Sequence, residues 1–79
     1  MNSSEISVFV GRRIKEMRTK AGLTQEALAQ KACVDRSYIV GIETAKRNVS
    51  LGTLDKICRA MNVSFFEIFS ENVDYSQRK

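Results

Sequence analysis

Residues 25–44 read QEALAQKACVDRSYIVGIET, and the organisation of the whole chain follows from this segment. It has the pattern of two short helices separated by a tight turn around Cys33. Asp35 is a residue type that caps helix N-termini, and Ile39 and Ile42 then follow at the spacing of one buried helix face. We therefore expect the second helix to turn its polar side chains outward from its first turn onward.

Helical spacing continues on both sides of this segment. A stripe of apolar residues predicts a first helix over about residues 5–21, with Ile6, Val10, Ile14, Met17 and Ala21 on its buried face. A second stripe predicts a helix over about residues 51–61, with Leu54, Ile57, Cys58 and Met61 facing the core. Ser64 and Glu67 form a capping-box pattern at the start of a short helix at about residues 65–70. With no proline and no alternating pattern, the sequence predicts an all-α fold.

Residue types that end or begin helices separate these stripes. Gly22 can adopt the left-handed conformation that ends a helix, and Thr24 can cap the helix that follows. Ser50 is a suitable cap for the helix at 51–61, and one of residues 2–4 can cap the first helix. The predicted helices therefore have chemical as well as periodic boundaries.

Length and composition limit the classes of function. We expect 79 residues to form one domain, residues 1–79, with no room for an effector domain or a large catalytic cleft. A net charge of +4 and a pI near 9.4 favour a polyanionic partner without proving one. With two cysteines and no histidine, we expect no metal site, no cofactor and no disulfide framework. The sequence contains neither a glycine-rich phosphate loop nor a nucleophile beside a base, so we do not expect an enzyme.

The ends of the chain give weaker signals. The start, MNSSEISVFV, lacks the basic beginning and long apolar centre of a secretion signal. No apolar run approaches the roughly 20 residues that span a bilayer, so we expect a cytoplasmic protein with no membrane partner. The polar tail at about residues 71–79 has no strong helical pattern, and it is either frayed or a short helical extension.

Residues from about 12 to 69 resemble the phage-repressor type of helix-turn-helix domain, a lambda-repressor-like fold. The run VDRSYIVGIE, followed by KRN, is similar to the controller proteins of restriction-modification systems. The residues that carry the match are Gln25, Ala29, Ile39, Ile42 and Glu43. The resemblance implies a compact five-helix domain whose second motif helix, residues 36–44, reads DNA. It also implies an ion pair between Arg18 and Glu43 that holds the recognition helix on the first helix.

The same resemblance assigns DNA contacts to the motif and the loop after it. The candidate DNA-binding residues are Gln25, Arg36, Ser37, Tyr38, Val40, Thr44, Lys46, Arg47 and Asn48. Arg36 is the first choice for direct reading, because its planar guanidinium can bond guanine O6 and N7 together. Gln25 and the basic loop at 46–48 are expected to meet phosphates. Tyr38 either contacts DNA through its hydroxyl or ring, or packs along the domain surface.

Four positions depart from what the relatives or a regular helix would have. Cys33 stands where many relatives have glycine or asparagine, so it is either a strained left-handed residue or part of a relaxed turn. Val40 and Thr44 replace a serine and an arginine that are common in controller proteins, which implies an altered sequence preference and one missing contact. Gly41 costs about 1 kcal/mol inside a helix, so we expect close approach of a neighbouring backbone or of DNA.

The C-terminal helix carries a cluster of large apolar residues. The candidate dimer-interface residues are Phe65, Phe66, Ile68 and Phe69, which the family resemblance places at a twofold interface. The alternative is that all four belong to the core. A homodimer would present two recognition helices roughly 34 Å apart and would require a palindromic operator on double-stranded DNA.

These observations favour a sequence-specific, dimeric DNA-binding transcription regulator, and the family resemblance implies a restriction-modification controller that acts on its own operon. A patch including Glu16, Glu26 or Asp55 is a candidate contact for RNA polymerase. Within the same class, an antitoxin or a phage-type repressor is the alternative. In another class, the fold would be a protein-interaction module that does not bind DNA, and the salt dependence of duplex binding separates the two.

Overall fold

The computed structural model describes residues 3–70, which form four α-helices and one 3₁₀ helix. The elements are α1 (Ser3–Lys20), α2 (Gln25–Ala32), α3 (Arg36–Glu43), α4 (Leu51–Ala60) and η1 (Phe65–Phe69). The predicted all-α fold with a helix-turn-helix is confirmed. The predicted fifth α-helix is wrong in type, because residues 65–69 form a tighter 3₁₀ helix. The expectations for Asn2 and for the tail at 71–79 concern residues outside the described range.

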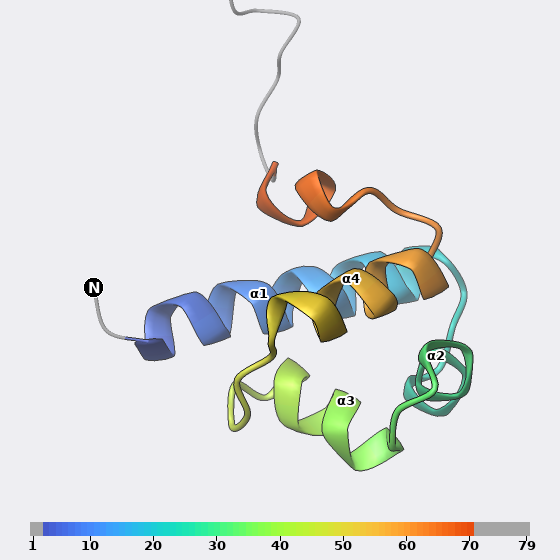
Figure 1. Ribbon diagram of the computed structural model, residues 1–79, viewed down its shortest axis with the longest axis horizontal. Coiled ribbons are helices and arrows are strands. Elements are labelled where there is room, and N and C mark those ends of the chain that lie inside the picture. The colour runs from blue at the N-terminus through green and yellow to red at the C-terminus, as the bar shows by residue number, and fades with distance from the viewer. Residues whose placement is uncertain (1–2, 71–79) are drawn as a thin grey trace, which may run out of the picture.

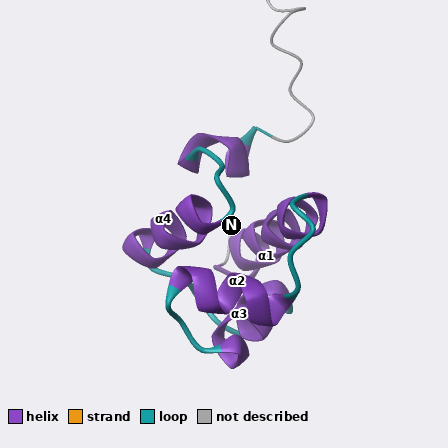
Figure 2. Cartoon of the chain, turned by 90° about the vertical axis from the view of Figure 1, so that its right-hand side faces the viewer, coloured by secondary structure: helices purple, strands orange, loops and turns teal. Residues whose placement is uncertain are grey.

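The helices form two ends joined by α1 and α4. At one end α2 packs on α3, α3 packs on α1, and α2 packs on α4. At the other end η1 packs on both α1 and α4. Figure 1 shows α3 at the bottom and η1 at the top, and the perpendicular view in Figure 2 keeps them on opposite sides of α1 and α4. The helix expected to read DNA therefore lies far from the aromatic C-terminal segment.

One apolar core fills the space between the helices. Its buried residues are Val10, Ile14, Leu28, Ala29, Ala32, Ile39, Ile42, Leu54, Ile57, Cys58, Met61 and Ile68. The predicted inward faces of α3 and α4 are confirmed by this set. The predicted stripe of α1 is wrong at both ends, because Ile6 is 48% exposed and Ala21 is exposed beyond the helix. The first turns of α1 extend past the core that the rest of the helix covers.

Most helix boundaries follow the predicted capping chemistry. Thr24 and Ser50 accept hydrogen bonds from the backbone N–H groups of Ala27 and Thr53, and the capping box before η1 is complete. Gly22 ends the turn after α1 with φ of 75°. The prediction for Asp35 is wrong in its chemistry, because Asp35 occupies the N-cap position but its side chain makes no capping hydrogen bond.

The turn of the motif contains a left-handed cysteine. Cys33 ends α2 with φ of 60° and ψ of 43°, so the strained alternative is the one that the structure adopts. Its backbone N–H donates to the carbonyl of Gln30, and the next N–H donates to the carbonyl of Ala29. These two bonds satisfy the last carbonyl groups of α2, which partly offsets the cost of the left-handed backbone.

A glycine at the contact of α1 with α3 sets the spacing of these helices. A Cβ atom at Gly11 would collide with the carbonyl oxygen of Ile42 and would lie 3.2 Å from the Cα atom of Glu43. Both of these atoms belong to backbone, which cannot move aside as a flexible side chain would. Gly11 therefore allows the last turn of α3 to lie directly against α1.

Candidate nucleic-acid interface

A buried ion pair fixes the end of α3 against α1. The Nε and Nη2 atoms of Arg18 lie 2.6 and 3.0 Å from the two carboxylate oxygens of Glu43. The side chains are only 9% and 2% exposed. The hydrogen bond and charge of Glu43 raise the pKa of Arg18 above its ordinary value, against a smaller opposing effect of burial. The pair predicted from the resemblance is therefore present, in the two-pronged geometry that arginine and carboxylate favour.

The same carboxylate also positions the start of α2. The amide nitrogen of Gln25 donates to Glu43 at 3.1 Å, and the third nitrogen of Arg18 donates to the carbonyl of Leu23 at 2.8 Å. Gln25 was expected to point its amide at a phosphate, whereas the amide N–H here is used inside the protein. The side chain is half-buried, and it holds the two motif helices in register.

The outward side of α3 begins with two exposed residues. Arg36 and Ser37 lie in the first turn of the helix with their side chains in solvent. A shallow depression beside them is lined by Thr24, Gln25, Glu26 and Arg36, so the N-termini of α2 and α3 open onto the same surface. This surface and the basic loop after α3 are the candidate DNA-binding surface, which we call the recognition face; it consists of the first turns of α2 and α3 and residues 46–48.

The other predicted contacts of α3 are less available. Tyr38 is half-buried and packs against the core, which is the surface-packed alternative for its ring. Val40 was expected to point outward, yet it is half-buried. Thr44 is exposed, but its hydroxyl donates back to the carbonyl of Val40 at 2.8 Å. Arg36 and Ser37 are thus the side chains of α3 that the structure leaves most accessible to a base edge.

The loop from Ala45 to Asn48 lies beside α3 and contains three exposed polar residues. Lys46, Arg47 and Asn48 are all exposed, and Ala45 makes the turn with φ of 62°. The guanidinium carbon of Arg47 lies 5.0 Å from the centre of the Tyr38 ring. Asn48 accepts a hydrogen bond of 2.8 Å from the hydroxyl of Ser7. The loop is thereby attached to α3 on one side and to the first half of α1 on the other.

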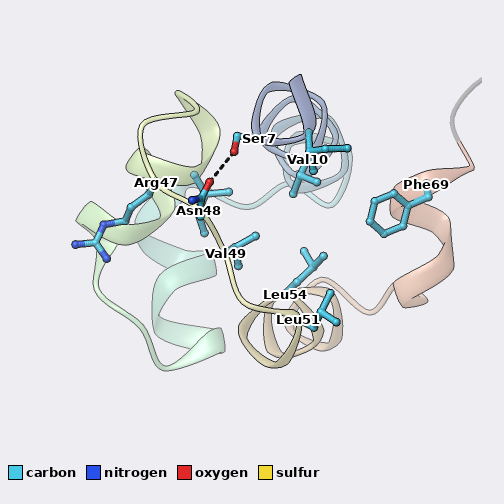
Figure 3. A pocket seen from close by; sticks show the side chains of 10 residues that line it. Ser7, Val10, Arg47, Asn48, Val49, Leu51, Leu54 and Phe69 are labelled. Atoms are coloured by element: carbon cyan, nitrogen blue, oxygen red, sulfur yellow. Dashed lines mark hydrogen bonds between the residues drawn. The ribbon is translucent and has the colours of Figure 1, made fainter. Parts of the chain in front are cut away.

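An apolar hollow lies behind this loop. Figure 3 shows Val10, Leu54 and Val49 in its wall, Phe69 across from the loop, and Arg47 extending away from it. Ile6, Leu51 and Phe69 line it as well, and these three side chains are 48%, 72% and 47% exposed. Exposed apolar side chains gathered around a hollow make this surface a candidate interaction site.

The predicted dimer-interface residues divide into two pairs. Ile68 is fully buried in the protein's own core and Phe65 packs against that core, so the core alternative holds for both. Phe66 is 77% exposed and Phe69 is 47% exposed. Sequence reasoning did not anticipate that Phe9 would stack on Phe69, with ring centres 6.0 Å apart. The aromatic cluster therefore includes α1 as well as η1.

Among residues 3–70, no group of three or more histidine, cysteine, aspartate or glutamate side chains is placed to hold a metal ion. No helix in this part of the chain is both long enough and apolar enough to cross a membrane.

Comparison with known proteins identifies the class of this domain. Residues 14–68 match the family model described as HTH_3, helix-turn-helix, and the chain belongs to this family. Within that class, it is a relative of the controller proteins of restriction-modification systems. It is 38% identical over 69 residues to the control protein C.MunI from a Mycoplasma species. The matched residues cover 86% of this chain and 93% of C.MunI.

Solved structures agree with this placement. The crystal structure of the controller protein C.AhdI from Aeromonas hydrophila matches with a TM-score of 0.80 and 42% identity, covering 82% of this chain and 98% of that one. The immunity repressor of Bacillus phage phi105 is 42% identical over 62 residues. That match covers 78% of this chain but only 43% of the repressor, so the likeness is to one part of a longer protein.

Proposed function

We propose that this protein is a restriction-modification controller that binds a palindromic operator in its own operon as a homodimer. The observation that carries the proposal is the recognition face, where Arg36 and Ser37 project from a helix fixed at its other end by the buried pair of Arg18 and Glu43. A recognition helix reads bases through its N-terminal side chains, so a fixed C-terminal end keeps those side chains in register with the major groove. The site of action is then the cytoplasm, and the role is regulatory rather than enzymatic.

Contacts to the sugar-phosphate backbone come from groups around that helix. Lys46, Arg47 and Asn48 lie exposed in the loop after α3. The N-terminus of α2 supplies backbone N–H groups near Gln25, and such groups bind phosphate oxygens well. Several phosphate contacts make affinity fall steeply with salt, because each one releases counterions from the duplex.

The homodimer in this proposal uses four exposed apolar residues, two from η1 and two from the first turns of α1 and α4. These are Ile6, Leu51, Phe66 and Phe69, which replace the set inferred from sequence, since Ile68 and Phe65 serve the core. A second copy that covers them would remove large apolar side chains from water. A twofold arrangement would then place two recognition helices about one turn of DNA apart, roughly 34 Å.

The experiment that tests the proposal is selection of bound duplexes from a random pool, followed by affinity measurements at two salt concentrations. Arg36→Ala should cost about 1–3 kcal/mol on the selected sequence and relax preference at one base position in each half-site. Lys46→Ala is the matched control, and it should weaken all duplexes equally. If the wild-type protein bound no duplex even at low salt, the alternative of a protein-interaction module would replace the regulator.

Contact with RNA polymerase is a further part of the proposal. Of the three acidic candidates, Glu16 pairs with both Arg12 and Arg13, and Asp55 pairs with Arg59. Glu26 is exposed in the first turn of α2 and belongs to the recognition face, which a bound duplex would cover. We therefore favour Asp55 as the residue to test, because its side chain is 46% exposed on α4, outside that face. Asp55→Asn should lower activated transcription in a purified system without lowering operator affinity.

A further inference from the structure

Gly41 weakens α3, because glycine is unfavourable inside a helix, and the structure shows which group lies against it. Its backbone carbonyl accepts two hydrogen bonds from the loop, from the N–H groups of Lys46 at 2.8 Å and Arg47 at 3.1 Å. A Cβ atom at this position would lie 3.1, 3.2 and 3.4 Å from the Cβ, Cδ and Cγ atoms of Arg47. The aliphatic part of Arg47 therefore lies across the surface that a side chain at position 41 would occupy.

The far end of the same arginine is also held. Its guanidinium group lies 5.0 Å from the centre of the Tyr38 ring, a distance at which a cation is attracted to an aromatic face. Tyr38 and Gly41 lie one turn apart on α3, so the arginine follows the outside of the recognition helix. Figure 3 shows Arg47 directed away from the apolar hollow and toward α3. An exposed arginine in a loop would otherwise sample many rotamers.

We propose that Gly41 is a positioning residue for Arg47, and that it acts by leaving room for the arginine to lie along α3 with its charge available to a DNA phosphate. The proposal rests on the proposed function, because it assumes that the recognition face meets a duplex. The close approach at Gly41 is thereby to the protein's own arginine rather than to DNA. Reduced rotamer freedom before binding means that less entropy is lost when the phosphate contact forms.

The first experiment needs no DNA. Protons of the Arg47 side chain near an aromatic ring have shifted NMR resonances, and Tyr38→Leu supplies the reference without the ring. Gly41→Ala should move these resonances part of the way to the reference values, and Gly41→Leu should move them fully. Gly52→Ala is the matched control, because a Cβ atom there meets nothing within 4 Å. Unchanged Arg47 resonances in both Gly41 variants would overturn the proposal.

The second experiment measures duplex affinity in a double-mutant cycle. Arg47→Ala should lower affinity about tenfold, the loss expected for one charged hydrogen bond, and should reduce the slope of affinity against salt by about 0.9. Gly41→Ala should lower affinity by a smaller factor in the wild type and have no effect in the Arg47→Ala background. Thermal stability should change little in Gly41→Ala, because alanine favours the helix while its Cβ atom would lie only 3.1 Å from the Cβ atom of Arg47. A merely structural role would instead lower stability and affinity together.

The outcomes separate the two proposals. An equal loss from Gly41→Ala in both backgrounds would mean that position 41 meets the DNA itself, and the positioning role would be wrong. A loss with Arg47→Ala but none with Gly41→Ala would refute the positioning role and leave the regulator intact. If the wild type bound no duplex, the regulator would fail and this inference with it.

Discussion

An arginine of α1 holds each end of the domain: Arg18, which is buried, at the recognition end with α2 and α3, and Arg13, which is half-buried, at the aromatic end with η1. Arg18 binds the carboxylate of Glu43 at the recognition end. At the aromatic end, Arg13 donates to the backbone carbonyls of Ile68 and Glu67 at 2.9 and 2.6 Å. Removing one member of a buried ion pair leaves a charge without compensation, whereas the backbone carbonyls that Arg13 binds carry no net charge. Loss of the arginine should therefore cost more free energy at the recognition end than at the end we assign to dimerisation.

The sharpest test of this difference compares Arg18→Ala with Arg13→Ala. Loss of Arg18 leaves Glu43 buried and charged, so the free energy of unfolding should fall by about 3–5 kcal/mol. Loss of Arg13 should cost about 1–2 kcal/mol, because it removes two hydrogen bonds to neutral carbonyls and a pair with Glu16, which is 41% exposed. Urea denaturation measures both, and Arg59→Ala is the surface control, since its pair with Asp55 is exposed. Equal losses for Arg18 and Arg13 would remove the distinction between the two ends.

A buried thiol in α4, which both ends of the domain pack against, gives the next largest effect and one that depends on pH. Burial, with smaller effects of Asp55 and Glu67, raises the pKa of Cys58 from 9.0 to about 11. As pH rises, the thiol loses its proton in the unfolded chain before it does so in the folded protein, and this favours unfolding. The stability that the protonated thiol gives the fold is therefore complete below pH 9 and declines as pH rises toward 11. Wild type should lose about 2–3 kcal/mol relative to Cys58→Ala over this range in denaturation curves. A difference that stays constant from pH 8 to pH 11 would contradict the assignment.

Backbone strain at the recognition end gives a smaller effect. Cys33 adopts a left-handed conformation that costs a non-glycine residue roughly 1–2 kcal/mol. Glycine removes this strain but increases the entropy of the unfolded chain, so Cys33→Gly should stabilise by at most about 1 kcal/mol or be neutral. Differential scanning calorimetry measures the shift, with Cys33→Ala as the control that keeps the strain. A clear loss of stability in Cys33→Gly would show that the cysteine side chain itself contributes.

A substitution of Phe66 at the aromatic end should have the smallest effect on folding and the largest effect on dimerisation. Phe66 is 77% exposed, so Phe66→Glu should change the free energy of unfolding by less than about 0.5 kcal/mol. It should nevertheless shift the protein from dimer to monomer in sedimentation experiments, because it places a charge in the proposed interface. Ile68→Glu is the contrasting variant, and it should unfold the domain. If Phe66→Glu remained a dimer, the interface would have to lie elsewhere on the protein.

What the sequence predicted well was set by local chemistry. Thr24, Ser50 and the box of Ser64 with Glu67 cap their helices as expected, because a capping side chain bonds to backbone only two or three residues away. The pair of Arg18 and Glu43 was implied by family resemblance, since no periodicity connects positions so far apart. The inward faces of α3 and α4 followed from spacing alone.

What the sequence did not predict depends on how distant segments meet. Gly11 matters because the carbonyl of Ile42 approaches it, and a lone glycine on a helix gives no sign of which backbone will do so. Arg13 donates to backbone carbonyls of η1, and nothing in the sequence around it indicates a partner more than fifty residues away. Ile68 and Phe66 have similar apolarity, and they lie on opposite sides of η1; which side is buried is decided by the packing of η1 on α1 and α4.

The two arginines of α1 also limit how this protein can change in length. Successive residues of an α-helix are rotated by about 100°, so one inserted or deleted residue between Arg13 and Arg18 would turn one arginine away while the other kept its partner. The same change of register would also move Ile14 out of the core. Gaps in alignments of related chains should therefore fall outside residues 13–18, in the turn around Gly22 or in the loop before α4.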